Sequence, residues 1–357
     1  MQIAIRADAS VDIGTGHVMR CLALAEALRP QGAEIAFICR EQDGDLCGLI
    51  AAREFEVLRL PRLSAGEIWD WQSDAVQTAR VLSAKWPRAD WLAVDHYRLD
   101  ARWETAMRPI AERIMAIDDL ADRRHDCALL VDQNLSRDMD KRYAGLVPES
   151  ARLLLGPEHA LLRAEFATAR AAGKRRDGTL RRILVFFGGS DAGNETAKAL
   201  EGLRLFERPD IAVDVVIGAT NPHHERIGRL CAALPGAILH RQVNNMAELM
   251  AAADLALGGG GITTWERCCL GLPALVTILA DNQVELARAA AEYGAIVNLG
   301  AAEVVSAADY RLALEALTPS QLARMGQRGA ALVDGDGCGR VAQAMRRISF
   351  PPLEQEG

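Results

Sequence analysis

The sequence lacks any uninterrupted apolar run near the ~20 residues that a transmembrane helix requires. Its N-terminus enters a predicted strand at once, without the basic and then apolar leader of a secretory signal peptide. Acidic residues outnumber basic ones, 48 against 41, and the net charge of −7 gives no general attraction to nucleic acid or to anionic membranes. We therefore expect a cytoplasmic protein that binds neither nucleic acid nor membrane.

The sequence also lacks the spacings that are typical of metal sites. The eight cysteines are scattered without a Cys-x-x-Cys pair, and no His-x-x-x-His or Cys/His cluster appears. We expect reduced thiols in a buried core, no metal and no other cofactor. The one alternative is magnesium, because acidic residues follow several predicted strands.

The N-terminal stretch predicts a strand, a glycine loop and a helix in direct succession. Ile3–Ile5 is a short apolar run of the kind found in buried strands. Gly14 and Gly16 allow a tight turn, and apolar residues then recur at helical spacing as far as Leu28. His17 is thus predicted in the first turn of a helix, at the mouth of the loop.

The predicted place of His17 has a chemical consequence. Free N–H groups and the positive end of the helix dipole favour an anion there and disfavour a protonated imidazole. A neutral imidazole is what a general base needs. The alternative is a plain turn that carries a structural histidine.

Strand and helix patterns alternate along both halves of the chain. In the first half, three predicted strands run into polar residues, at 95–97, 118–119 and 132–134. The carboxyl ends of parallel strands share one edge of a sheet, where open α/β folds bind ligands. We therefore predict an α/β protein of two Rossmann-like, doubly wound domains with an intervening cleft.

The boundary between the predicted domains lies in a small and basic segment. Residues 167–179 lack large apolar side chains, and the strand pattern starts again directly after them. We expect an N-terminal domain over residues 1–166, a linker over 167–180 and a C-terminal domain over 181–357.

Three segments of the second half have the composition of phosphate-binding loops. Gly188–Ser190 follows a strand and precedes a helix, so its N–H groups can cradle a phosphate, with a plain turn as the alternative. Gly258–Gly261 precede a predicted helix, in which the hydroxyl of Thr264 can bind a diphosphate and the carboxylate of Glu266 can bind a ribose. The alternative is that a threonine only caps the helix. Asp281–Gln283 follows the next strand, and its side-chain amides can either bind a sugar phosphate or cap the helix that follows.

The segment RADASVDIGTGHVMRCLALA at 6–25 closely resembles the signature of the PseG-type nucleotide-sugar hydrolases of pseudaminic acid synthesis. GGGGITTWERCCLGLP, DNQ, VDHY and LLGPEHALLR are also similar to that family, so the resemblance covers nearly the whole chain. His159 stands where the family leads us to expect tyrosine, outside the matched catalytic positions. The resemblance implies a GT-B-like fold and a metal-free reaction of UDP-2,4-diacetamido-2,4,6-trideoxy-β-L-altropyranose with water, which releases UDP and the free sugar.

The resemblance also implies roles for individual residues. UDP would lie on the C-terminal domain and the sugar would face His17, which would take a proton from the attacking water. Tyr97 would orient the water or the sugar, while Asp8 and Arg20 would position the loop or the substrate, or form a structural salt bridge. The catalytic candidates are His17 and Tyr97, and the binding candidates are Asp8, Gly14, Gly16, Arg20, Gly189, Ser190, Met246, Gly260, Thr264, Glu266, Asn282 and Gln283.

Two other functions remain open from the sequence. A GT-B glycosyltransferase would use the same UDP-sugar site and pass the sugar to an acceptor, so the fold alone does not decide. A regulatory protein would bind the nucleotide sugar without turnover. The expected partner is a UDP-sugar in each case, and the sequence predicts no oligomeric state.

Overall fold

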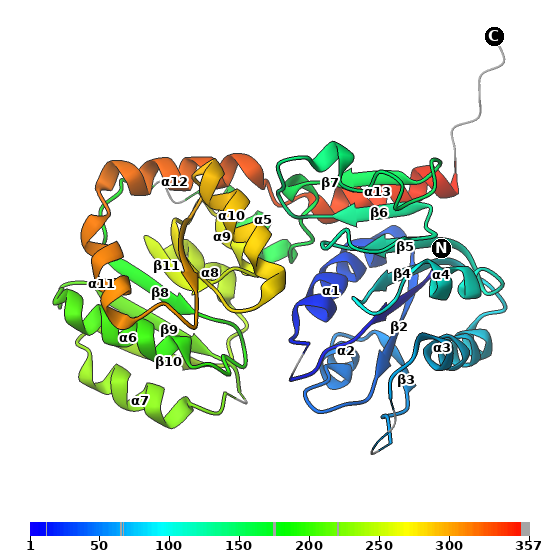
Figure 1. The fold of residues 1–357 in the computed structure, drawn as a ribbon, viewed down its shortest axis with the longest axis horizontal. Coiled ribbons are helices and arrows are strands. Elements are labelled where there is room, and N and C mark those ends of the chain that lie inside the picture. The colour runs from blue at the N-terminus through cyan, green and yellow to red at the C-terminus, as the bar shows by residue number, and fades with distance from the viewer. Residues whose placement is uncertain (12, 65, 67, 174–175, 220, 351–357) are drawn as a thin grey trace, which may run out of the picture. The chain divides into compact units, whose positions relative to one another are not determined.

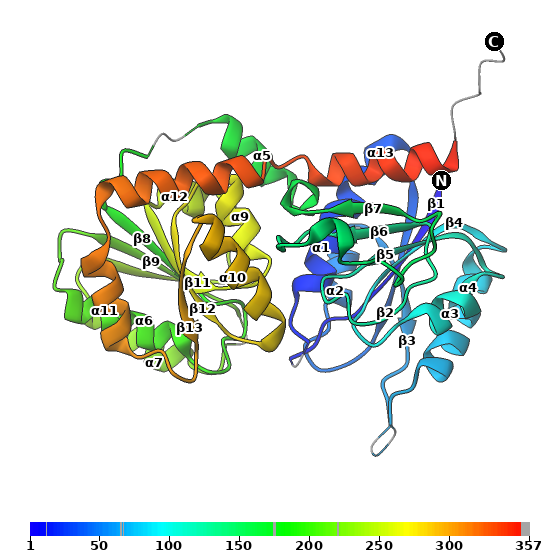
Figure 2. The same cartoon turned by 45° about the horizontal axis from the view of Figure 1, so that its top comes forward.

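The computed structural model describes two compact units, each with a parallel sheet between layers of helices (Figures 1 and 2). Unit 1 contains Met1–Asn134, Asp138–Arg163 and the C-terminal segment from Asp336, and unit 2 contains Leu135–Arg137 and Ala164–Gly335. The residues that the structure describes are 1–11, 13–64, 66, 68–173, 176–219 and 221–350. None of the helices in this part of the chain combines the length and the apolarity needed to cross a membrane.

Unit 1 is built on seven parallel strands in the order β3-β2-β1-β4-β5-β6-β7. The order changes direction between β1 and β4, and ligands of open α/β sheets bind at such a switch point, beyond the carboxyl ends of the strands. The elements of unit 1 are β1 (Gln2–Ala7), α1 (Gly16–Leu28), β2 (Glu34–Arg40), α2 (Cys47–Ala52), β3 (Glu56–Leu60), α3 (Trp71–Lys85), β4 (Ala89–Asp95), α4 (Ala101–Met107), β5 (Ala111–Ile117), β6 (Leu129–Asp132), β7 (Arg152–Leu155) and α13 (Gly337–Ser349).

The strands of unit 1 are apolar on both faces because helices cover both. Ile3 and Ile5 of β1 pack into one core with side chains of α1, α2 and α13, while Ala4 faces a second core with α3 and α4. All eight cysteines of the chain are free and buried, as the sequence predicts.

Unit 2 repeats the plan with six parallel strands in the order β10-β9-β8-β11-β12-β13. Its switch point lies between β8 and β11, so the two predicted glycine segments, which lie at the carboxyl ends of those strands, are at the expected edge. The elements are α5 (Ala164–Ala171), β8 (Arg182–Phe186), α6 (Glu195–Phe206), β9 (Ala212–Ile217), α7 (His224–Ala233), β10 (Ala237–Arg241), α8 (Met246–Ala252), β11 (Leu255–Gly259), α9 (Thr263–Cys269), β12 (Ala274–Ile278), α10 (Val284–Tyr293), β13 (Val297–Ala301), α11 (Ala307–Ala316) and α12 (Pro319–Leu332).

The C-terminal helix differs from the predicted domain division. We expected it in the domain over 181–357, but α13 packs on unit 1, where Val341 and Met345 join the core under α1. Its first residue, Gly337, lies so close to the backbone that a Cβ there would be 2.2 Å from the carbonyl oxygen of Ala160. Apolar spacing predicts that a segment is helical but does not tell which of two sheets the helix covers.

The predicted linker also differs from the structure. Residues 164–171 form α5, whose Phe166 is fully buried. Arg170 donates to the carbonyl oxygens of Cys269 and Val333 at 2.7 and 2.9 Å, and Arg176 donates to that of Ala253 at 3.0 Å. The basic residues that made this segment look solvated therefore hold it to unit 2 by binding carbonyl groups at helix ends.

Candidate functional site

The loop between β1 and α1 has the predicted form. Gly14 has a φ of 79°, a left-handed conformation that favours glycine, and its N–H donates to the carbonyl oxygen of Ser10 at 2.9 Å. Helix α1 then begins at Gly16, which places His17 in the first turn, as expected. This loop lies at the switch point of unit 1, since it directly follows β1.

His17 is paired with a carboxylate at the end of β4, the strand beside β1. Its Nδ1 lies 2.5 Å from Oδ1 of Asp95, and both side chains are nearly buried. The ring of Tyr97 packs edge-to-face on His17 with centroids 4.6 Å apart. The structure thus brings both predicted catalytic residues into contact and pairs His17 with an aspartate that the resemblance did not single out.

Arg20 lies one helical turn after His17 and binds the same carboxylate. Its Nε and Nη2 donate to the two oxygens of Asp95 at 2.6 and 2.7 Å, and its Nη1 donates to Asp119 at 3.1 Å. Burial alone would raise the pKa of Asp95, but the charge of Arg20 and the hydrogen bonds from Arg20 and His17 outweigh it and hold that pKa far below its usual range. Asp95 is therefore an acceptor only, and the proton of a neutral His17 belongs on Nδ1.

His17 has more charged neighbours than the sequence indicated. The expectation of a neutral imidazole rested on the helix dipole alone, whereas the structure adds the negative Asp95 and the positive Arg20. With Nδ1 bound to the carboxylate, the other ring nitrogen, Nε2, carries the lone pair. A histidine held in this way can accept a proton from a water or a hydroxyl group.

Asp8 is brought into a separate, buried cluster. Its two oxygens accept from Arg6 at 2.5 and 2.8 Å, and the backbone N–H of Arg40 donates to it at 2.8 Å. Asp74 binds the same two arginines from α3. Of the two roles open from the sequence, these contacts favour the structural salt bridge, which fixes the end of β1 where the loop begins.

The acids that follow β5 and β6 meet at one edge, as predicted from parallel strands. Tyr143 donates to Asp118 and is also 3.1 Å from Oδ2 of Asp132. Burial raises the pKa of Asp132 to about 6. Among the described residues, no group of three or more His, Cys, Asp or Glu side chains is arranged to hold a metal ion.

His125 gives this acidic edge a testable pH dependence. Its Nδ1 lies 2.7 Å from Glu104, and although burial lowers its pKa, Asp118 and Glu104 outweigh burial and raise it to about 9. Such a group stabilises the fold fully below the unfolded pKa of ~6.5, and the contribution, roughly 3 kcal/mol, is lost as pH rises through about 9. We expect the wild-type free energy of unfolding, measured with urea from pH 6 to 10, to fall more steeply than that of His125→Gln. Parallel curves would contradict this.

In unit 2, two of the predicted binding residues, Gly260 and Gln283, are in direct contact. The side-chain oxygen of Gln283, in the short 3-10 turn Asp281–Gln283 that also contains Asn282, accepts from the backbone N–H groups of Gly260 and Leu279 at 3.1 and 3.0 Å. Glu266 belongs to α9 and is 8% exposed. Thr264 differs from the prediction, because it is fully buried and its hydroxyl accepts from Arg267.

The glycines of this loop are explained in part by packing within the protein. A Cβ at Gly258 would lie 2.6 Å from Nη1 of Arg267, and one at Gly259 would lie 2.8 Å from Leu279. The run of glycines, from which we inferred a ligand, therefore makes room first for side chains of unit 2. Arg267 was not a candidate from the sequence, and no pattern there marks it as different from a surface arginine.

The Gly188–Ser190 segment leads to a helix whose start is already occupied. Both oxygens of the Asp191 carboxylate accept there, from the backbone N–H groups of Glu195 and Thr196 at 2.8 and 3.0 Å. Only the loop itself, with Gly189 and Ser190 partly exposed, is left for an anion. Met246 begins α8, and its side chain is buried in unit 2.

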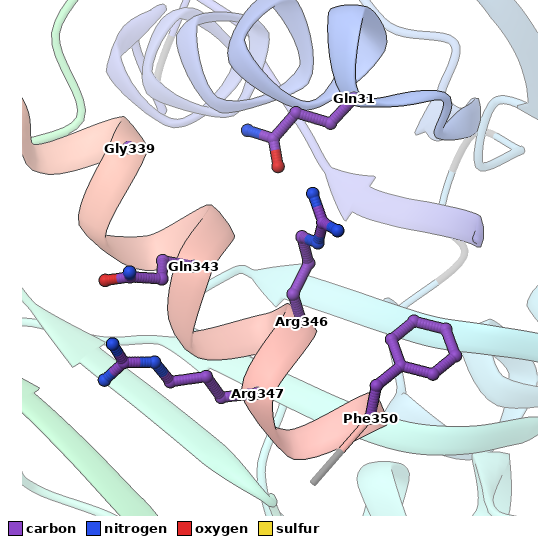
Figure 3. A pocket seen from close by; sticks show the side chains of 6 residues that line it. All are labelled: Gln31, Gly339, Gln343, Arg346, Arg347 and Phe350. Carbon is purple, nitrogen blue, oxygen red and sulfur yellow. The ribbon is translucent and has the colours of Figure 1, made fainter. Parts of the chain in front are cut away.

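A hollow of about 480 Å³ lies elsewhere on unit 1, along α13. Figure 3 shows that the side chains of Gln31 and Arg346 extend toward each other across it. None of the predicted site residues lines this hollow, which is formed by Gln31, Gly339, Gln343, Arg346, Arg347 and Phe350.

Comparison with known proteins gives distant relatives over most of the chain. No protein-family model matches it. The spore coat polysaccharide biosynthesis protein SpsG of Bacillus subtilis is 28% identical, over 98% of this chain and 98% of the relative. The UDP-2,4-diacetamido-2,4,6-trideoxy-beta-L-altropyranose hydrolase of Campylobacter jejuni is 23% identical, over 70% of this chain and 81% of the relative. The resemblance to PseG-type enzymes is thus present but distant.

Solved structures show the same fold. MurG of Acinetobacter baumannii matches with a TM-score of 0.66 and 14% identity, over 97% of this chain and 99% of that one. The calicheamicin glycosyltransferase CalG4 matches with a TM-score of 0.63 and 14% identity, over 99% of each chain. With its two doubly wound units, the protein has a GT-B-like α/β fold, as the sequence predicts.

Proposed function

We propose that the protein hydrolyses a UDP-linked sugar, UDP-2,4-diacetamido-2,4,6-trideoxy-β-L-altropyranose, with His17 as the general base. The observation that carries the proposal is the contact of 2.5 Å between Nδ1 of His17 and Oδ1 of Asp95. Because Asp95 takes the Nδ1 proton as a hydrogen bond, Nε2 is left to accept a proton from water. The similarity to the Campylobacter jejuni hydrolase supports the choice of substrate.

In the proposed reaction, a water oxygen forms a bond to the anomeric carbon of the sugar. The bond from that carbon to the phosphate oxygen breaks, and UDP leaves with the electron pair. The water gives one proton to Nε2 of His17, and Asp95 stabilises the imidazolium that forms. Arg20 holds the carboxylate of Asp95, and the ring of Tyr97 holds the imidazole from the side.

We assign UDP to unit 2. Gly188–Ser190 follows β8, and Gly258–Gly261 forms the end of β11 and the turn after it; these two strands flank the switch point of this unit. Backbone N–H groups in such loops suit a diphosphate. Glu266 and Asn282 are proposed as nucleotide or sugar ligands from the resemblance.

A glycosyltransferase that uses the same UDP-sugar is the alternative. A paired His17 and Asp95 can deprotonate the hydroxyl of an acceptor as well as a water molecule. The GT-B-like fold is compatible with both reactions. Only the fate of the sugar separates them.

The function is tested by incubating the full chain with the UDP-sugar in ¹⁸O-labelled water, with no acceptor. We expect UDP and free sugar to appear, with the label in the sugar, because water attacks the anomeric carbon rather than phosphorus. We also expect the rate to survive EDTA, and UDP-N-acetylglucosamine serves as the control substrate.

Each other outcome of this incubation points elsewhere. Turnover that starts only after an acceptor is added would establish a transferase. Binding without any turnover would favour a regulatory protein. Loss of activity in EDTA that magnesium restores would show that the reaction depends on a metal ion, against the expectation of a metal-free reaction.

A further inference from the structure

Arg267 is a buried cation directly beneath the loop Gly258–Gly261. Arg267 is 2% exposed, and its Nη2 donates to the carbonyl oxygen of Gly259 at 2.8 Å and to the hydroxyl of Thr264 at 3.0 Å. Nη1 lies 3.4 Å from the hydroxyl of Thr263. The guanidinium therefore contacts the loop at its strand end and at the first turn of α9.

Arg267 has no acid in direct contact among the described residues, although the charge of the adjacent Glu266 raises its pKa slightly against the effect of burial. It forms no salt bridge with any described residue, and its Nε is buried without a hydrogen-bond partner. Burial lowers its pKa to about 10, so the group still carries a positive charge at neutral pH. A buried charge without a counter-ion is costly, which is why proteins usually pair such groups.

Other buried arginines of this chain show the usual pattern. Arg6 binds Asp8 and Asp74, and Arg20 binds Asp95 and Asp119. Gly258 makes room for the guanidinium, since a Cβ there would lie 2.6 Å from Nη1 and 2.5 Å from the carbonyl oxygen of Phe186. The loop is thus built around Arg267, which differs from Arg6 and Arg20 in having no described carboxylate in contact with it.

We propose that the diphosphate of a bound nucleotide is the counter-charge of Arg267. The inference rests on the proposed function, because it deepens the assignment of UDP to unit 2. Arg267 acts as a positioning residue: it holds the carbonyl of Gly259 and the hydroxyls of Thr263 and Thr264, and its positive charge attracts the phosphates through the loop. It does not touch the ligand.

The test separates charge from hydrogen bonding in the full-length protein. Arg267→Lys keeps the charge without the forked donor, and Arg267→Gln keeps a donor without the charge. Calorimetric titration with UDP, with uridine and with inorganic pyrophosphate measures the affinity of each variant. We expect Arg267→Gln to lower the affinity for UDP and for pyrophosphate on the order of tenfold or more and to leave the affinity for uridine unchanged. Arg267→Lys should keep most of the affinity for UDP.

The matched control is Arg170→Met. Among the described residues, Arg170 donates to three backbone carbonyl groups, one of them at the other end of α9, so its loss should leave UDP affinity unchanged. Equal UDP affinities of the Lys and Gln variants would overturn the inference, as would equal losses for UDP and uridine. If the wild type binds pyrophosphate but not UDP, the nucleotide assignment fails and the Arg267 comparison is made with pyrophosphate. A wild type that binds no diphosphate overturns both.

Discussion

His17→Asn is expected to lose ~10²–10⁴-fold in turnover of the UDP-sugar, the usual contribution of a general base. Asparagine fills much of the same space but cannot take up a proton from water. UDP affinity should stay unchanged, because the nucleotide is assigned to unit 2 and His17 belongs to unit 1. Initial rates of UDP release at saturating substrate and calorimetry with UDP measure the two effects separately.

The control for His17→Asn is His159→Asn, which removes another nearly buried histidine of unit 1. His159 has no proposed role, so this variant should keep wild-type turnover. If His17→Asn also keeps near-normal turnover, another group activates the water. If it loses UDP binding as well, the assignment of sugar and nucleotide to different units is wrong.

Asp95→Asn should reduce turnover on the order of 10³-fold, although Asp95 does not touch the substrate in the proposed reaction. Its carboxylate lies at hydrogen-bond distance from His17 Nδ1 and from two nitrogens of Arg20. An amide has one acceptor oxygen and adds donors of its own, so it cannot satisfy both partners. The proton of His17 would then no longer be held on Nδ1, and Nε2 would lose its role as base.

A double variant shows whether Asp95 acts through His17. Groups that work as a unit have strongly non-additive effects, so His17→Asn with Asp95→Asn should be no slower than His17→Asn alone. Additive losses would mean that Asp95 contributes independently, for example by holding unit 1 together. Urea unfolding of each variant, followed beside the rates, identifies that case directly.

Local patterns predicted the parts of the site that lie close together in the chain. Strand, turn and helix around Gly14 and His17 follow from apolar spacing and from the conformation that glycine allows. The polar ends of parallel strands had to meet because parallel strands share a direction. The fold class followed from the same alternation of strands and helices, repeated in both halves.

What the sequence did not reveal are contacts between distant positions. Asp95 is 78 residues from His17, and only the register of β1 beside β4 brings them together. The sequence also did not reveal which polar residues are buried. Thr264 and Arg267 look like accessible polar residues, yet both side chains lie in the interior of unit 2. The apolar face of α13 fits either core by composition, and packing alone assigns it to unit 1.

The placement of α13 makes unit 1 a discontinuous domain with unit 2 inserted into it. During synthesis, strands β1 to β7 leave the ribosome first, but α13, which packs in the same core as Val18 and Leu22 of α1, emerges only after unit 2. Unit 2 is therefore able to fold before unit 1 has its whole core, the reverse of the usual order along a chain. A fragment that starts at residue 181 would carry α13 with its apolar face uncovered, whereas one that ends near residue 335 would leave α1 exposed to aggregation.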